Sequence, residues 1–251
     1  MKLKTGGKPL TFIRTTVSRK NPLSLGRTCR KKRIKLINQF RELGGCKLET
    51  ELSIITKKSI HESFNRISVD GDTSTSDTVF VATTNKRNLE LTKGKKEIAI
   101  EIFYNELKGS MIDLAKKIII DGEGATKFIT VRVKNAKDTY RARKICFSIA
   151  NSLLVKTAIA GEDANWGRLV MAIGKTQIKV QTNKIKIYVQ GILLCENGRG
   201  IDTVDEVTLS NSLKNKNIKI LIDLAEGGKE FTSWTSDLTE EYIKINADYR
   251  S

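Results

Sequence analysis

The chain has 251 residues, which is long enough to bury a substantial core as one large domain or two modest ones. Its formal net charge of +17 is concentrated in residues 1–58, which hold 16 Lys and Arg against 3 Asp and Glu, a net charge of +13. The remainder carries only +4. Such a nearly balanced body does not indicate a nucleic-acid-binding surface, so the basic character belongs to the N-terminal segment.

The cysteines and the single histidine argue against a metal centre. Cys29, Cys46, Cys146 and Cys195 form no Cys-x-x-Cys pair, and His61 lies off the apolar stripe of its segment. Cys146 falls in a helical pattern and Cys195 in an apolar run, which suits buried free thiols in a reducing compartment. No apolar run approaches the ~20 residues needed to cross a bilayer, and no secretory signal follows the basic start. We therefore expect a cytoplasmic protein with no metal and no membrane contact.

Residues 1–56 form a basic segment of unassigned origin that we expect to be poorly ordered. Three interpretations are open: a presequence that would direct the protein to an organelle, a basic arm for nucleic acid or anionic membrane, or out-of-frame translation joined to a shortened gene. Aromatic residues that could stack on bases are scarce, only Phe12 and Phe40. We favour the third interpretation, place the presequence second, and treat residues 57–251 as the domain.

The first half of this domain shows three helical patterns and two strand patterns. Ile60, Phe64 and Ile67 predict a helix over 57–68. A strand over 78–82 follows, then a long helix over 97–120, a strand over 128–133 and a helix over 136–151, of which Tyr140, Ile145 and Ile149 are expected to face inward.

The second half shows short strands between short helices. A helical run over 165–173 contains Trp166, which we interpret as structural. Strands are predicted over 177–181, 184–190, 192–194 and 218–224, with a turn at Thr182 and Asn183, and Thr239 is a good cap for a last helix. The pattern is of antiparallel type, and the mixture predicts a layered α+β domain.

Two polar turns are candidate sites. The loop after Asp70 looks like a calcium loop, but Thr75 and Val81 stand where the loop needs a glycine and an acid, so we interpret it as a side-chain-capped turn. In the other turn two glycines bracket Glu123 between the long helix and the next strand. No motif for phosphate cradling, hydride transfer or metal hydrolysis is present, so we expect no cofactor.

Five segments in this order and spacing resemble the C-terminal (β) chain of the ornithine acetyltransferase family, also called bifunctional glutamate N-acetyltransferase. They are SFNRISVDGDTSTSD at 63–77, DGEGATK at 121–127, SLLVKTA at 152–158, GEDANWGR at 161–168 and YIKINADYRS at 242–251. The resemblance covers residues 57–251, and we find none before Lys57. It implies a layered α/β/β/α sandwich and acetyl transfer from N-acetylornithine to glutamate in arginine biosynthesis.

The resemblance also implies which residues touch substrate. The family's substrate-binding glutamate falls on Glu123, and its C-terminal asparagine and terminal hydroxyl residue fall on Asn246 and Ser251. A carboxylate can hold a substrate ammonium group, while an amide and a hydroxyl can hold a carboxylate or amide.

The catalytic part of the family's site is not found in this sequence. In the family a threonine in an Ala-Thr-Met-Leu segment is the nucleophile, but residues 36–43, where it should stand, contain no threonine. The α chain with its oxyanion donors is missing too. We expect a shortened member with no catalytic residue of its own, inactive unless an α-type partner complements it. An alternative hypothesis, from a different class of function, is a non-enzymatic nucleic-acid-binding module that uses the basic arm.

Overall fold

The structure is a computed structural model that describes residues 12–16, 49–73, 77–82 and 93–248. The chain divides into two compact units. Unit 1 comprises Met1–Asn65, Thr73–Leu114 and Ser251, and unit 2 comprises Arg66–Asp72 and Ala115–Arg250. Most of the basic segment 1–56 lies outside the described residues, so its separation from the rest stays a prediction.

Unit 1 is built around a small apolar cluster between two helices. Its elements are β1 (Phe12–Thr16), α2 (Glu49–His61), β3 (Thr78–Ala82) and the first part of α3 (Lys93–Ile120), and β1 pairs antiparallel with β3. Ile55 of α2 is buried with Leu107 and Met111 of α3. The last two are four residues apart and so share one helix face, as the apolar spacing of the long helix predicted.

The helix predicted over 57–68 is only partly right. It begins earlier and ends at His61, a 3₁₀ turn covers Phe64–Arg66, and Ile67–Ser68 form the short strand β2. Tertiary pairing explains the difference, because Ile67 lies parallel to Trp234 in the sheet of unit 2. A helical spacing of three apolar residues cannot reveal such a distant partner.

Unit 2 contains one seven-stranded mixed sheet in the order β2-β9-β4-β8-β5-β6-β7. Two pairs, β2 with β9 and β4 with β8, are parallel, and the others are antiparallel. The sequence predicted strand pairing of antiparallel type only, so it missed the two parallel pairs. The strands are β4 (Phe128–Ala136), β5 (Lys186–Val189), β6 (Ile192–Glu196), β7 (Arg199–Gly200), β8 (Asn217–Asp223) and β9 (Lys229–Ser236), with β2 at the edge.

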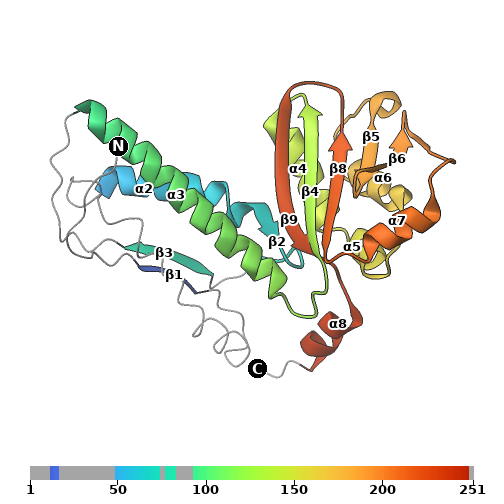
Figure 1. The fold of residues 1–251 in the computed structure, drawn as a ribbon, viewed down its shortest axis with the longest axis horizontal. Coiled ribbons are helices and arrows are strands. Elements are labelled where there is room, and N and C mark those ends of the chain that lie inside the picture. Colours follow the sequence, from blue (N-terminus) through green and yellow to red (C-terminus); the bar gives the residue numbers. More distant parts are fainter. Residues whose placement is uncertain (1–11, 17–48, 74–76, 83–92, 249–251) are drawn as a thin grey trace. The chain divides into compact units, whose positions relative to one another are not determined.

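Helices cover one face of this sheet, with α4 and α6 behind the strands in Figure 1. Alternation along β4 turns Ile129, Val131 and Val133 toward them, each at most 1% exposed, and leaves Arg132 exposed on the other face. The helices are α4 (Thr139–Ala150), α5 (Leu153–Ala160), α6 (Trp166–Gly174), α7 (Glu206–Leu213) and α8 (Glu240–Ala247). The α+β class is confirmed, and unit 2 supplies a sheet layer and a helical layer.

Several local predictions were wrong. Tyr140 is 67% exposed, because it lies in the first turn of α4, whereas Ile145 and Ile149 are buried as expected. Residues 177–181 are irregular, and Thr182–Lys184 form a 3₁₀ turn. The hairpin turn lies instead at Gln190 and Gly191 between β5 and β6, both with positive φ. The sequence reading also missed β9, α5 and α7.

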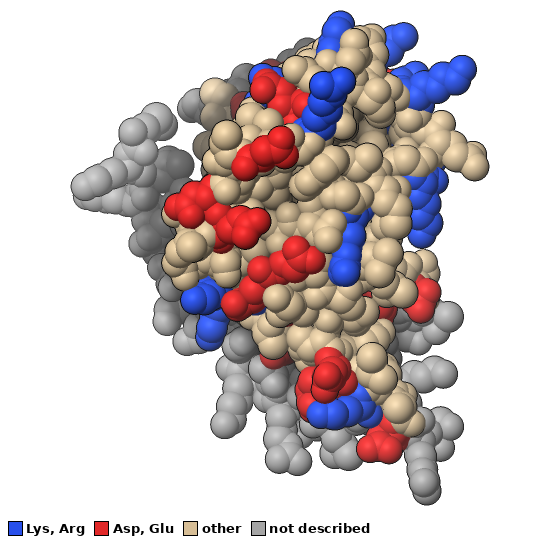
Figure 2. Space-filling model, turned by 90° about the vertical axis from the view of Figure 1, so that its right-hand side faces the viewer, with Lys and Arg blue, Asp and Glu red and all other residues tan. Residues whose placement is uncertain are grey.

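The described surface does not repeat the basic character of the N-terminal segment. On the face shown in Figure 2, acidic side chains gather down the middle and basic ones lie mostly toward the top and right edges. This mixture agrees with the near balance of charge after residue 58. No helix in the described ranges is long and apolar enough to cross a membrane.

Candidate functional site

The turn that carries Glu123 depends on Gly124, because a side chain at this position would displace neighbouring backbone atoms. The helix α3 ends at Ile120, and the amide of Gly122 donates to the carbonyl of Ile119 at 3.2 Å. Gly124 has φ of +65°, and a Cβ built on it would lie 2.4 Å from the backbone nitrogen of Tyr242. The turn is therefore packed directly against the start of α8.

Thr239 adds a hydrogen bond to this contact. It stands at the N-cap of α8, as predicted, but its side chain makes no capping bond to the helix. Its hydroxyl instead donates to the carbonyl oxygen of Gly124 at 2.7 Å. The acidic side chains of Glu240 and Glu241 in the first turn still interact favourably with the helix dipole. The residue expected to cap α8 therefore fixes the glycine turn.

The arrangement brings two of the three predicted site residues together. Asn246, exposed on α8, donates through Nδ2 to the Oε2 atom of Glu123 at 3.1 Å and to the carbonyl of Tyr242 at 2.8 Å. Glu123 is half-buried. The two side chains meet although 123 positions separate them. Ser251 lies outside the described residues.

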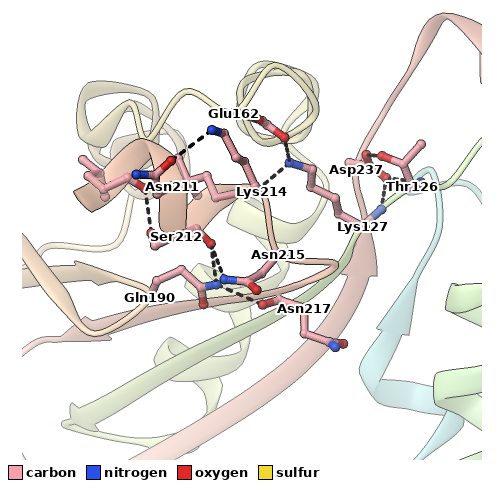
Figure 3. Close-up of polar contacts among 12 residues, drawn as sticks. Thr126, Lys127, Glu162, Gln190, Asn211, Ser212, Lys214, Asn215, Asn217 and Asp237 are labelled. Atoms are coloured by element: carbon pink, nitrogen blue, oxygen red, sulfur yellow. Dashed lines mark hydrogen bonds and ion pairs between the residues drawn. The ribbon is translucent and has the colours of Figure 1, made fainter. Parts of the chain in front are cut away.

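Asp237 holds the chain immediately after the turn. It follows β9, is 3% exposed, and accepts hydrogen bonds from the amides of Thr126 and Lys127 at 2.9 and 3.0 Å. The Thr126 hydroxyl donates to the second carboxylate oxygen. Figure 3 shows Thr126 beside Asp237, whereas the side chain of Lys127 points away from it toward Glu162. Hydrogen bonds to a carboxylate are among the stronger ones in proteins.

Lys156 of α5 lies at the centre of a second cluster and is 1% exposed. Its ammonium group donates to the carbonyls of Val69 and Ser236 at 2.7 and 2.6 Å and to the Thr235 hydroxyl at 2.9 Å. Burial lowers the pKa of Lys156 from 10.5 to about 8, and the carboxylates of Asp237 and Asp70 offset part of that effect. One side chain thus joins the ends of β2 and β9.

The Asp70 loop is a side-chain-capped turn. The Oδ1 atom of Asp70 accepts from the amide of Asp72 at 3.0 Å, and Oδ2 accepts from the hydroxyl of Tyr242 at 3.1 Å. Because Tyr242 belongs to α8, this loop and the helix that carries Asn246 are tied together.

Lys127 connects the glycine turn to the segment 161–168. It is 8% exposed and donates to Glu162 at 3.0 Å and to the carbonyl of Leu213, the last residue of α7, at 2.6 Å (Figure 3). Glu162 has φ of +59°, an unusual conformation for a residue other than glycine. The buried ammonium group therefore stabilises both a turn and a helix end.

The remaining polar residues that the sequence singled out are structural. Asn165 caps α6 through the amide of Arg168, and Trp166 packs against Gly200, where a Cβ would lie 2.9 Å from its ring. His61 is exposed. In the described ranges no three His, Cys, Asp or Glu side chains cluster as metal ligands would.

The two cysteines of unit 2 are buried free thiols, as expected. Burial raises the pKa of Cys146 to about 12, and burial also raises the pKa of Cys195. Neither thiol is therefore suited to act as a nucleophile.

Sequence reasoning missed the residues that support the site. Asp237 and Thr239 were not linked to the glycine turn because their partners lie more than a hundred positions away. Lys156 falls inside one of the motifs, but nothing local shows that it is buried. The only available signal was a single charged residue in a run that is otherwise apolar except for Thr157.

Comparison with known proteins first defines the class. A chain from the crystal structure of arginine biosynthesis bifunctional protein argJ of Bacillus halodurans matches with a TM-score of 0.75 and 38% identity, over 82% of this chain and 96% of that chain. This similarity confirms the α+β fold of the ornithine acetyltransferase type.

The sequence relatives agree. The ArgJ family model matches residues 48–251, so the match begins somewhat before Lys57. The arginine biosynthesis bifunctional protein ArgJ of Bartonella henselae is 42% identical over 200 residues, and that of Ruegeria pomeroyi is 43% identical over 204. These alignments cover 80% and 81% of this chain, but 49% and 48% of the relatives. The chain belongs to the ArgJ family, as the resemblance predicted, and spans about half the length of these relatives.

Proposed function

We propose that this chain provides the substrate-binding half of an acetyltransferase that moves an acetyl group from N-acetylornithine to glutamate in arginine biosynthesis. The observation that carries the proposal is the contact between Glu123 and Asn246 at 3.1 Å. It places a carboxylate and an amide at one point on the surface. Both groups offer acceptor oxygens to the ammonium group of an amino acid.

Glu123 binds the ammonium group of the substrate in this proposal. A carboxylate has about four lone-pair sites on two oxygens, so it can accept a substrate N–H beside that of Asn246. Such charge-assisted hydrogen bonds are stronger than neutral ones. The hydroxyl of Ser251 binds the substrate carboxylate. Asn246 accepts a substrate N–H through Oδ1, because its two amide N–H groups already donate to Glu123 and to the carbonyl of Tyr242. The C-terminal residues therefore select a zwitterionic ligand rather than a simple amine.

Catalysis in this proposal requires an α-type partner chain. Acyl transfer through a covalent intermediate needs an activated nucleophile and donors for the developing oxyanion. The resemblance places a threonine in the first role, and residues 36–43 contain none. A partner that supplies both functions must therefore carry the threonine segment in addition to the α chain, while this chain binds and orients the amino acid in the cytoplasm.

The experiment compares acetyl transfer by the purified chain with transfer by the chain mixed with an α-type chain from an ArgJ relative that is extended through its Ala-Thr-Met-Leu segment. Radiolabelled N-acetylornithine is the donor, and retained label is counted on each polypeptide. We expect no label on this chain in either case, and label on the partner. Label bound covalently to this chain would overturn the division of roles.

A second candidate function is nucleic-acid binding through the basic segment, favoured by the net charge of +13 on residues 1–58. Such binding would be weak and would fall steeply with salt. Fluorescence anisotropy with a labelled duplex, repeated after deletion of residues 1–56, tests it. Absence of binding at low salt would end this candidate.

A further inference from the structure

We propose that Asp237 is a positioning residue that sets the distance between Glu123 and Asn246 and so determines affinity for the amino-acid substrate. This inference rests on the proposed function. It assigns to a buried carboxylate, which touches no substrate, the task of holding the two residues that do.

Asp237 occupies a junction between the two halves of the site. It lies between Ser236, the last residue of β9, and Glu240, the first residue of α8. Its backbone is therefore continuous with the helix that carries Asn246. Its carboxylate, in contrast, is bonded to Thr126 and Lys127, which directly follow the turn that carries Glu123. A single residue thus belongs to one half of the site and binds the other.

The glycine turn is held at two points by the same short linker. Thr239 donates to the carbonyl of Gly124, and Asp237 accepts from the amides of Thr126 and Lys127. The amide of Asp237 also donates to the carbonyl of Lys127 at 3.3 Å. Two attachments on either side of residue 125 fix the orientation of the turn as well as its distance from α8.

Lys156 keeps Asp237 in place. The ammonium group of Lys156 donates to the carbonyl of Ser236, which precedes Asp237. The backbone carbonyl of Lys156 accepts from the amide of Leu238, which follows Asp237, at 3.4 Å. The linker is thus bound on both sides of Asp237. The ammonium group is also the nearby cation that a carboxylate only 3% exposed requires.

The experiment uses the full chain with Asp237→Asn, which keeps the size of the side chain but removes its charge and replaces one acceptor by a donor. Asp205→Asn is the matched control. Asp205 accepts from the amides of Val207 and Thr208 and from the Thr208 hydroxyl, the same set of bonds, but at the start of α7. Thr126→Val, which removes only the hydroxyl donor, is measured as well in case Asp237→Asn does not fold.

Two measurements separate this inference from the proposed function. The first needs no ligand: the side-chain amide resonances of Asn246 in a ¹H–¹⁵N spectrum report its contact with Glu123. They should shift in Asp237→Asn, and in the same direction but less in Thr126→Val, while Asp205→Asn leaves them unchanged. Unshifted Asn246 resonances in the Asp237 and Thr126 variants would overturn the inference.

The second measurement is a calorimetric titration with ornithine. Asp237→Asn should weaken binding about tenfold or more, and Asp205→Asn should not. In a Glu123→Gln background, Asp237→Asn should have little further effect, because it acts through Glu123. Equal losses in the Asp237 and Asp205 variants would contradict positioning. If the wild type binds no ornithine, the proposed function fails, while the Asn246 resonances still decide the inference.

Discussion

Replacing Gly124 by alanine should damage the site far more than the same change at another glycine of similar conformation. Gly124 and Gly191 both have positive φ, +65° and +84°, so alanine at either position costs about 1–2 kcal/mol of backbone strain. A Cβ on Gly191 meets nothing within 4 Å, whereas one on Gly124 would lie 2.4 Å from the backbone nitrogen of Tyr242 and 2.9 Å from the Thr239 hydroxyl.

The overlap at Gly124 adds about 1–3 kcal/mol, the usual cost of overpacking, because backbone atoms of α8 cannot rotate away as a flexible side chain could. Gly124→Ala should therefore lose about 2–5 kcal/mol of unfolding free energy, or α8 should move off the turn. Gly191→Ala should lose only about 1–2 kcal/mol.

Urea denaturation of both variants, followed by circular dichroism, measures the difference in unfolding free energy. Hydrogen exchange of the α8 amides detects helix displacement, which the denaturation curve alone would miss. Equal losses of stability in the two variants, together with unchanged protection of α8, would refute the packing of Gly124 against Tyr242.

Three further predictions concern buried groups. As the pH rises from 8 to 10.5, the free energy of unfolding of the wild type should increase by up to about 3 kcal/mol relative to Lys156→Met, as measured by urea denaturation at each pH. Burial lowers the pKa of Lys156 to about 8, so in this window the unfolded state binds more protons than the native state. Cys146 should resist alkylation at pH 8 until the chain is unfolded, as peptide mapping would reveal, because its thiol is buried and its pKa is about 12. Lys127→Met should cost about 2–4 kcal/mol in chemical denaturation, since it leaves the carbonyl of Leu213 and Glu162 without this donor. Lys186→Met, which removes a half-exposed ion pair with Glu196, should cost clearly less.

The elements that the sequence predicted well are those with a strong local signal. The long helix α3 has apolar residues every three or four positions, and β4 alternates cleanly, so both could be recognised without tertiary information. The strand β9 was missed because two of its three inward positions are polar: they hold Phe231, Ser233 and Thr235. These side chains are buried because they pair with β4 and bond to α4 and α5, which no local pattern reveals.

The site shows the same division. Glu123 and Asn246 were identified through motifs that resemble a known family, and their contact follows from the fold. Asp237 could not be identified, because its partners come from the far end of the domain and an aspartate before a helix is usually a cap. The contact of the Thr239 hydroxyl could not be predicted for a similar reason. Its position before α8 predicts a helix cap, but in the structure the hydroxyl donates to the carbonyl of Gly124 instead.

The most direct test of the proposed function is calorimetric binding of ornithine to the full chain, because it asks whether Glu123 recognises an amino-acid ammonium group before any catalysis takes place. Glu230→Gln is the control, since Glu230 is an exposed carboxylate on β9 that pairs with Arg132 of the neighbouring strand β4. We predict that the wild type and Glu230→Gln bind ornithine equally and that Glu123→Gln binds at least about tenfold more weakly. Equal affinity of Glu123→Gln and the wild type would contradict the assignment of Glu123 as the substrate-binding carboxylate.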